Sequence, residues 1–187
     1  LIEASGRFIA APSANLSGKP SPTLAEHVIA DLKGRIDMIL DGGSVSIGIE
    51  STVLDVTGEV PVILRPGFIT KEMLEDVVGE VKVDPGIQGD LTLDIKPKAP
   101  GMKYRHYAPK GELTIVEGND IEMVAEEINA ITEVMMSQGN KVGIIATDES
   151  MDLYQNGTVL SIGSREDDTT VAANLFRVLR EFDSLGM

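Results

Sequence analysis

Apolar residues recur at helical spacing soon after the start of the chain. They occupy every fourth position from Leu24 to Leu32, which predicts a helix. Thr23 and Glu26 fit a capping box at its beginning, and Gly34 is placed to end it.

The same spacing predicts three more helices, and short apolar or alternating runs predict strands between them. The helices are expected at 71–78, 121–137 and about 170–182, and the strands at 36–40, 51–56, 60–65, 113–116, 142–146 and 158–162.

This order of elements predicts an α/β fold with two domains joined by a linker. Residues 1–83 form the first domain and 112–187 the second, whose alternating strands and helices favour a parallel sheet. Residues 84–111 have no periodicity and are interrupted by proline and glycine, as expected of a linker. About three strands is few for a sheet, and Leu1 starts within an expected helix, so we expect both domains to be incomplete.

Composition excludes several kinds of chemistry. The 187 residues include no cysteine and two histidines, His27 and His106, so thiolate catalysis and histidine-rich metal sites are excluded. A metal is expected only together with a substrate. The apolar runs are too short for a spanning helix or a secretion signal, so we expect a cytoplasmic protein without membrane association.

The formal net charge of −14 disfavours broad contact with nucleic acid. Positive charge gathers only in residues 96–110, which contain five cations and no acid. This segment is either a patch for a polyanion or a solvated linker.

The loop 11–23 is the richest in candidate ligand groups. It crowds Ser13, Asn15, Ser17 and Ser21 between prolines, before the positive end of the next helix. Hydroxyl and backbone N–H groups of this kind suit an anion, although the same residues also make ordinary turns.

Two further places carry polar groups at strand ends. Ser51 and Thr52 begin an apolar strand, where they are either ligand contacts or satisfied hydroxyls. Arg65 ends the next strand before Pro66 and Gly67, and its guanidinium suits either a triphosphate or a surface ion pair.

Residues 101–109 set two tyrosines among three cations. Tyrosine rings and arginine planes stack on bases, so this part of the linker is predicted to fold over a nucleotide. Alternatively, its tyrosines dock the linker onto a domain surface.

Four segments together resemble the Sua5/YrdC family. They are Ala-Pro-Ser-Ala-Asn at 11–15 with Ser-Pro-Thr at 21–23, Gly-Ile-Glu-Ser-Thr-Val at 48–53, Ile-Leu-Arg-Pro-Gly at 63–67 and Pro-Gly-Met-Lys-Tyr-Arg-His-Tyr-Ala-Pro at 100–109. The resemblance implies a partial YrdC-like domain, a linker and a Rossmann-like Sua5 C-terminal domain. It also implies a nucleotidyltransferase that joins ATP, L-threonine and bicarbonate into threonylcarbamoyl-AMP for tRNA modification, with Mg²⁺ accompanying the triphosphate and weak or indirect contact with tRNA.

The resemblance also assigns residues to the two larger substrates. ATP is expected at Ser13, Asn15, Ser21, Arg65, His106 and Tyr107, and threonine at Ala11, Ser51 and Thr52.

One departure limits this expectation. The family's Lys-x-Arg motif belongs to early strands that this chain lacks, and Lys103-Tyr104-Arg105 has its spacing in another place. We therefore expect this chain alone to bind nucleotide weakly. The alternatives are an RNA-binding module without catalysis and a carbamoyltransferase of another pathway.

Overall fold

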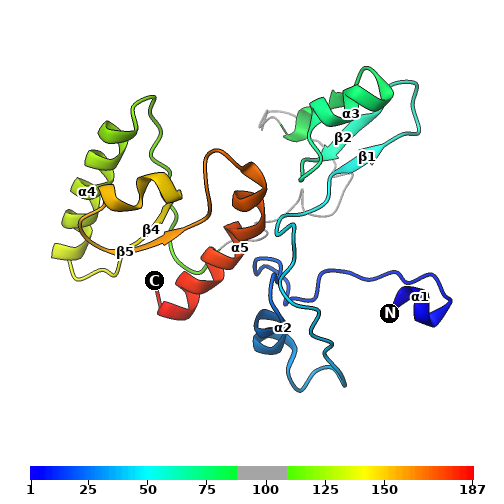
Figure 1. Ribbon diagram of the computed structural model, residues 1–187, viewed down its shortest axis with the longest axis horizontal. Helices are drawn as coiled ribbons and strands as arrows, with labels where there is room; N and C mark the ends of the chain where they lie inside the picture. Colours follow the sequence, from blue (N-terminus) through cyan, green and yellow to red (C-terminus); the bar gives the residue numbers. More distant parts are fainter. Residues whose placement is uncertain (88–108) are drawn as a thin grey trace.

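The computed structural model describes residues 1–87 and 109–187 (Figure 1). The expected linker segment, including His106 and Tyr107, therefore lies mostly outside the described residues. Within the described ranges the chain has the mixed α/β character that its patterning predicted. No helix there is both long and apolar enough to cross a membrane.

The first part of the chain contains a small sheet with a helix beside it. Strands β1 (Val53–Asp55) and β2 (Val62–Arg65) pair antiparallel, and β3 (Lys82–Val83) adds to β2 in parallel. Ile63, Leu64 and Val81 are buried here. The helices of this part are α1 (Ile2–Ser5), α2 (Ala25–Leu32), α3 (Lys71–Val78) and the 3₁₀ turn η1 (Pro85–Ile87).

Helix α3 has the bounds that its sequence predicted, because its ends are locally encoded. The Thr70 hydroxyl accepts a hydrogen bond from the Met73 N–H, and Gly79 follows the last turn with a positive φ.

The second part is a two-stranded parallel sheet between helices. Strands β4 (Gly143–Ala146) and β5 (Thr158–Ser161) pair in parallel, as predicted. Helix α4 (Ile121–Ser137), the 3₁₀ segment η2 (Asp148–Leu153) and helix α5 (Asp168–Leu185) complete it. The core of this part comprises Ala125, Ile144, Ala146, Phe176, Val178, Leu179 and Phe182.

Two predicted strands are wrong. Residues 36–40 make only an isolated bridge between Lys33 and Ile36, and residues 113–116 form no strand. Leu40 and Ile115 are exposed there. An apolar run becomes a strand only when a neighbouring strand pairs with it, and no described residues supply that partner.

The predicted capping box of α2 is also wrong. The N-cap is Leu24, which makes no side-chain cap hydrogen bond. The Thr23 side chain is instead buried beside His27, whose Nδ1 accepts a hydrogen bond from the Thr23 N–H at 3.1 Å.

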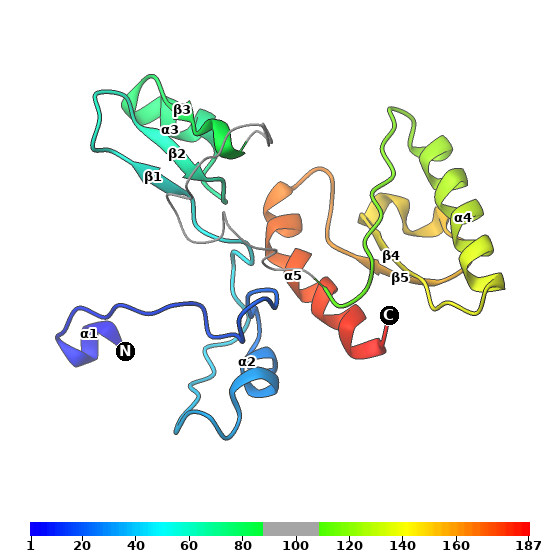
Figure 2. The same cartoon turned by 180° about the vertical axis from the view of Figure 1, so that it is seen from behind.

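Helix α5 lies on the side of the second part that faces the first part. In both views it separates the β4–β5 sheet and α4 from α2 and the segment leading to β1 (Figures 1 and 2). The Arg180 side chain of α5 donates to the Pro20 carbonyl oxygen, and the Gly48 N–H donates to the Ala172 carbonyl oxygen of α5. The position of α5 therefore matters for the segments that carry the candidate site.

Candidate functional site

Arg65 at the end of β2 is bonded to Ser51 just before β1. Its Nε and Nη2 donate to the Ser51 carbonyl oxygen at 3.2 and 2.8 Å, and Nη2 also reaches the Ser51 Oγ at 3.2 Å. The hairpin register causes this contact, since Arg65 pairs with Val53 where the ladder is irregular. A carbonyl and a hydroxyl have no formal charge, so these contacts do not neutralise the Arg65 guanidinium. Its positive charge remains available to an anion.

The segment containing Ser51 packs closely against the turn after β2. A Cβ added to Gly67 would lie 2.4 Å from both the Glu50 carbonyl oxygen and the Thr52 nitrogen, so the site requires glycine. The Phe68 N–H donates to the Glu50 carbonyl at 3.2 Å, and the Thr52 hydroxyl donates to the Ile69 carbonyl at 2.5 Å. Residues 50–52 therefore have a defined position relative to Arg65.

The loop 11–23 reaches this segment through Ser21. Its hydroxyl donates to the Glu50 Oε1 at 2.7 Å. Ala11 and Ser13, which come earlier in the loop, are exposed. Ser21, Glu50, Ser51 and Arg65 thus form a continuous group drawn from three separate sequence segments.

Asn15 shapes the loop from within. Its Nδ2 donates to the carbonyl oxygens of Leu16 and Lys19 at 3.0 and 3.1 Å. Its Oδ1 is buried and accepts no hydrogen bond from the described residues. A buried acceptor without a donor costs about 1–3 kcal/mol, so this oxygen is suited to a ligand that supplies a donor or a cation.

Asp31 of α2 anchors the base of the loop. Its Oδ1 lies 2.6 Å from the Lys19 Nζ, and its Oδ2 accepts from the Leu16 N–H at 3.3 Å and the Arg180 Nη2 at 2.9 Å. Burial by itself raises the carboxyl pKa, but the hydrogen bonds from Arg180, Lys19 and Leu16 outweigh it and lower the pKa of Asp31 to about 2.

His27 lies beside this anchor. Burial and the nearby Arg180 charge lower the pKa of His27, which keeps its Nδ1 available as the acceptor for Thr23. His27 therefore has a structural partner in the neutral state.

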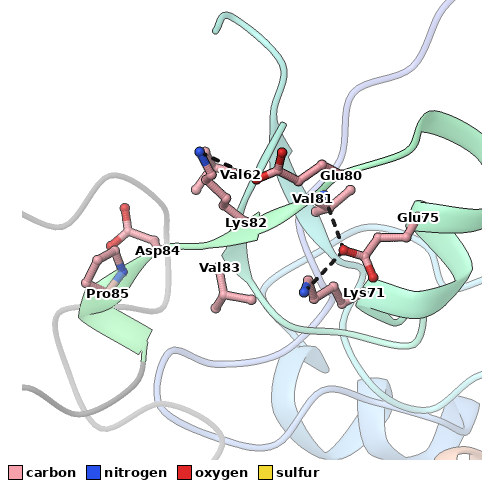
Figure 3. A pocket seen from close by; sticks show the side chains of 9 residues that line it. All are labelled: Val62, Lys71, Glu75, Glu80, Val81, Lys82, Val83, Asp84 and Pro85. Atoms are coloured by element: carbon pink, nitrogen blue, oxygen red, sulfur yellow. Dashed lines mark hydrogen bonds and ion pairs between the residues drawn. The ribbon is translucent and has the colours of Figure 1, made fainter. Parts of the chain in front are cut away.

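A hollow of about 550 Å³ lies elsewhere, between β2, β3 and the first half of α3 (Figure 3). Its two lysines are paired with glutamates: Lys71 lies 3.2 Å from Glu75 and Lys82 lies 3.6 Å from Glu80. It contains none of the residues predicted to bind substrate.

Sequence reasoning missed three residues of this region: Glu50, Asp31 and Arg180. Glu50 lies within the Gly-Ile-Glu-Ser-Thr motif, but the motif does not indicate that its carboxylate contacts Ser21. Asp31 and Arg180 stand on helices with apolar faces, where a charged residue signals a partner. Asp31 and Arg180 contact each other across 149 residues, and the spacing of residues along the sequence does not predict such a contact.

The described residues contain no cluster of three or more histidine, cysteine, aspartate or glutamate side chains able to hold a metal. Asn15 Oδ1 and the Glu50 carboxylate are oxygen ligands of the kind that bind Mg²⁺ together with phosphate oxygens.

Two domain families match successive parts of the chain. Residues 1–67 match the family described as "Telomere recombination" (Sua5/YciO/YrdC), and residues 69–187 match "Threonylcarbamoyl-AMP synthase, C-terminal domain".

Curated relatives agree with this assignment. The threonylcarbamoyl-AMP synthase of Bacillus subtilis is 50% identical over 98% of this chain and 51% of its own length. That of Pyrococcus abyssi is 46% identical over 100% of this chain and 52% of its own. The chain thus spans about half the length of these relatives.

Solved structures show the same likeness. The crystal structure of P. abyssi Sua5 complexed with L-threonine has a TM-score of 0.84 and 45% identity, over 98% of this chain and 51% of that one. A variant of P. abyssi Sua5 has a TM-score of 0.85 and 44% identity, over 100% of this chain and 51% of that one. The order of motifs, the fold and these likenesses agree, and the chain belongs to the Sua5-type threonylcarbamoyl-AMP synthase family.

Proposed function

We propose that the full-length protein makes threonylcarbamoyl-AMP and pyrophosphate from ATP, L-threonine and bicarbonate, for threonylcarbamoylation of tRNA adenosine. The observation that carries the proposal is that Ser21 is hydrogen-bonded to Glu50 and Arg65 to the neighbouring Ser51, which brings three motif segments together. The relatives named threonylcarbamoyl-AMP synthase and the P. abyssi Sua5 structure with L-threonine support it.

The proposed reaction uses a nucleophile made from the substrates. The amine of threonine attacks bicarbonate and gives a carbamate and water. A carbamate oxygen then attacks the α-phosphorus of ATP, and the bond to the β-phosphate breaks to release pyrophosphate. The protein's contribution is to orient the reactants and stabilise charge, so no cysteine nucleophile is required.

The site residues divide between the two larger substrates. Ser13 and Arg65 donate to ATP phosphates, and the Ser21 hydroxyl turns its single proton from Glu50 to a phosphate when ATP binds. Asn15 Oδ1 would be an oxygen ligand for the Mg²⁺ that accompanies ATP. Ala11, Ser51 and Thr52 contact threonine. His106 and Tyr107, which lie outside the described residues, are predicted to contact the nucleotide.

Two broader assignments accompany this function. We place the protein in the cytoplasm, where ATP and tRNA are available. The formal charge of −14 favours weak or indirect contact with tRNA over a broad RNA-binding surface.

The test is pyrophosphate release by the full-length protein, with mass-spectrometric detection of threonylcarbamoyl-AMP. We expect release to require both threonine and bicarbonate. Pyrophosphate release that is independent of either compound would contradict the proposal.

A further inference from the structure

Arg180 of α5 contacts the loop 11–23 directly at Pro20 and indirectly through Asp31 of α2. Its Nη2 lies 2.9 Å from the Asp31 Oδ2, and its Nε and Nη2 donate to the Pro20 carbonyl oxygen at 3.0 and 2.5 Å. The Arg180 side chain is 9% exposed and that of Asp31 is fully buried. This guanidinium therefore joins the second part of the chain to the residue next to Ser21.

The planar fork of arginine makes this double contact possible. One guanidinium meets a carboxylate and a backbone carbonyl in fixed directions, whereas a lysine presents a single point charge on a flexible stem. Asp31 also binds Lys19 and the Leu16 N–H of the same loop. A displaced Arg180 would therefore disturb the loop through Pro20 and through Asp31.

The same helix also binds the segment that leads to Ser51. The Gly48 N–H donates to the Ala172 carbonyl oxygen at 3.0 Å. A Cβ on Gly48 would lie 2.4 Å from the Ala173 carbonyl oxygen, so only glycine permits this approach. Ala172 and Arg180 are eight residues apart, a spacing that places them on one side of a helix.

We propose that α5 is a positioning element of the substrate site, which holds the loop of Ser13 and Ser21 through Arg180 and the segment of Ser51 through the Ala172 carbonyl. This inference rests on the proposed function, because that function assigns substrates to both segments. It gives the C-terminal domain a role in substrate binding although its own residues touch no substrate.

The physical reason is the precision that two-substrate chemistry requires. Ser21 and Ser51 belong to different segments, and a shift of about 1 Å in one of them lowers the rate by up to about a hundredfold. These segments are linked directly by the Ser21–Glu50 hydrogen bond and by the Val45 N–H, which donates to the Thr23 carbonyl oxygen at 3.0 Å. A rigid helix bonded to both segments limits their relative movement.

A purely stabilising contact makes a different kinetic prediction. If Arg180 only keeps the molecule folded, its replacement lowers the active fraction, so that kcat falls and KM is unchanged. If α5 positions the two segments, the KM values for both ATP and threonine rise in addition to the fall in kcat.

The experiment compares Arg180→Lys with Arg177→Lys in the full-length enzyme, at a temperature well below the Tm of each variant. Arg177 is a matched control on the same helix, because its hydrogen bonds to Asn174, Glu181 and the Ser161 carbonyl lie within the second part of the chain. We expect Arg180→Lys to raise both KM values about tenfold and Arg177→Lys to leave them near those of the wild type. We also expect faster hydrogen–deuterium exchange at 11–22 and 48–52 in Arg180→Lys alone.

The outcomes separate this inference from the proposed function. A wild-type enzyme that makes no product refutes the proposed function, and the exchange measurement still tests the attachment of both segments to α5. If the wild type is active, and Arg180→Lys changes the KM values and the hydrogen–deuterium exchange no more than Arg177→Lys does, the inference is overturned while the proposed function is unaffected. If Arg180→Lys does not fold, Gly48→Ala disturbs the second attachment and is judged against the same control.

Discussion

Arg65 and Ser51 are 14 residues apart in the chain and are joined by three hydrogen bonds, two to the Ser51 carbonyl and one to its hydroxyl. A residue proposed to bind phosphate therefore also holds a residue proposed to bind threonine. Because one side chain serves both, changes at Arg65 are expected to affect both substrates.

Arg65→Lys should weaken both ATP and L-threonine binding to the full-length protein by about tenfold. Lysine retains the charge but loses the fork that contacts Ser51, and one charged hydrogen bond is worth about 1.5–3 kcal/mol. Calorimetric titration with each ligand checks this. The exposed Arg35 supplies the control Arg35→Lys. Weakened ATP binding with unchanged threonine binding would contradict the inference that Arg65 holds Ser51 in position for threonine.

Ser21→Ala should lower ATP affinity by about tenfold. The substitution removes a donor proposed for phosphate and also leaves the Glu50 carboxylate without the hydroxyl that it contacts at 2.7 Å. Ser17→Ala in the same loop is the control, since the Ser17 side chain is exposed and makes no hydrogen bond with any other described residue. Equal ATP affinities for the two variants would show that Ser21 has no special role.

Gly67→Ala should lower the free energy of unfolding by about 1–3 kcal/mol, the usual cost of forcing atoms into a packed place. The new methyl group would meet the backbone of residues 50–52, which cannot move aside as a side chain does. Urea unfolding monitored by circular dichroism gives the value.

Gly58→Ala is the matched control for that experiment. Gly58 lies between β1 and β2, and the nearest atom to an added Cβ is the Val60 carbonyl oxygen at 3.8 Å. Comparable destabilisation by both substitutions would mean that the close approach at Gly67 is unimportant.

His27 should make stability depend on pH below neutrality. Burial and Arg180 lower its folded-state pKa below the usual 6.5, so the unfolded state binds the proton more readily. This contribution is complete above pH 6.5 and is lost as the pH falls from 6.5 through the lowered pKa. His27→Asn retains an acceptor for the Thr23 N–H and does not titrate. Urea midpoints at pH 7.5 and 5 should therefore differ more in the wild type, and equal differences would refute the assignment.

The sequence alone determined the helices whose ends carry their own signals. Helix α4 matches its predicted range because Asp120 accepts from the N–H groups of Glu122 and Met123 at its start. The motifs also indicated the family and the candidate residues, since these are properties of local residue order.

Tertiary structure decided everything that depends on a partner distant in the chain. The apolar runs at 36–40 and 113–116 have the sequence pattern of strands, yet no strand among the described residues pairs with them. The contact between Asp31 and Arg180 spans 149 residues, and no periodicity specifies which charges meet over that distance. A helix encodes its own hydrogen bonds between near neighbours, whereas strand pairing and inter-domain ion pairs arise only when the folded chain brings both groups together.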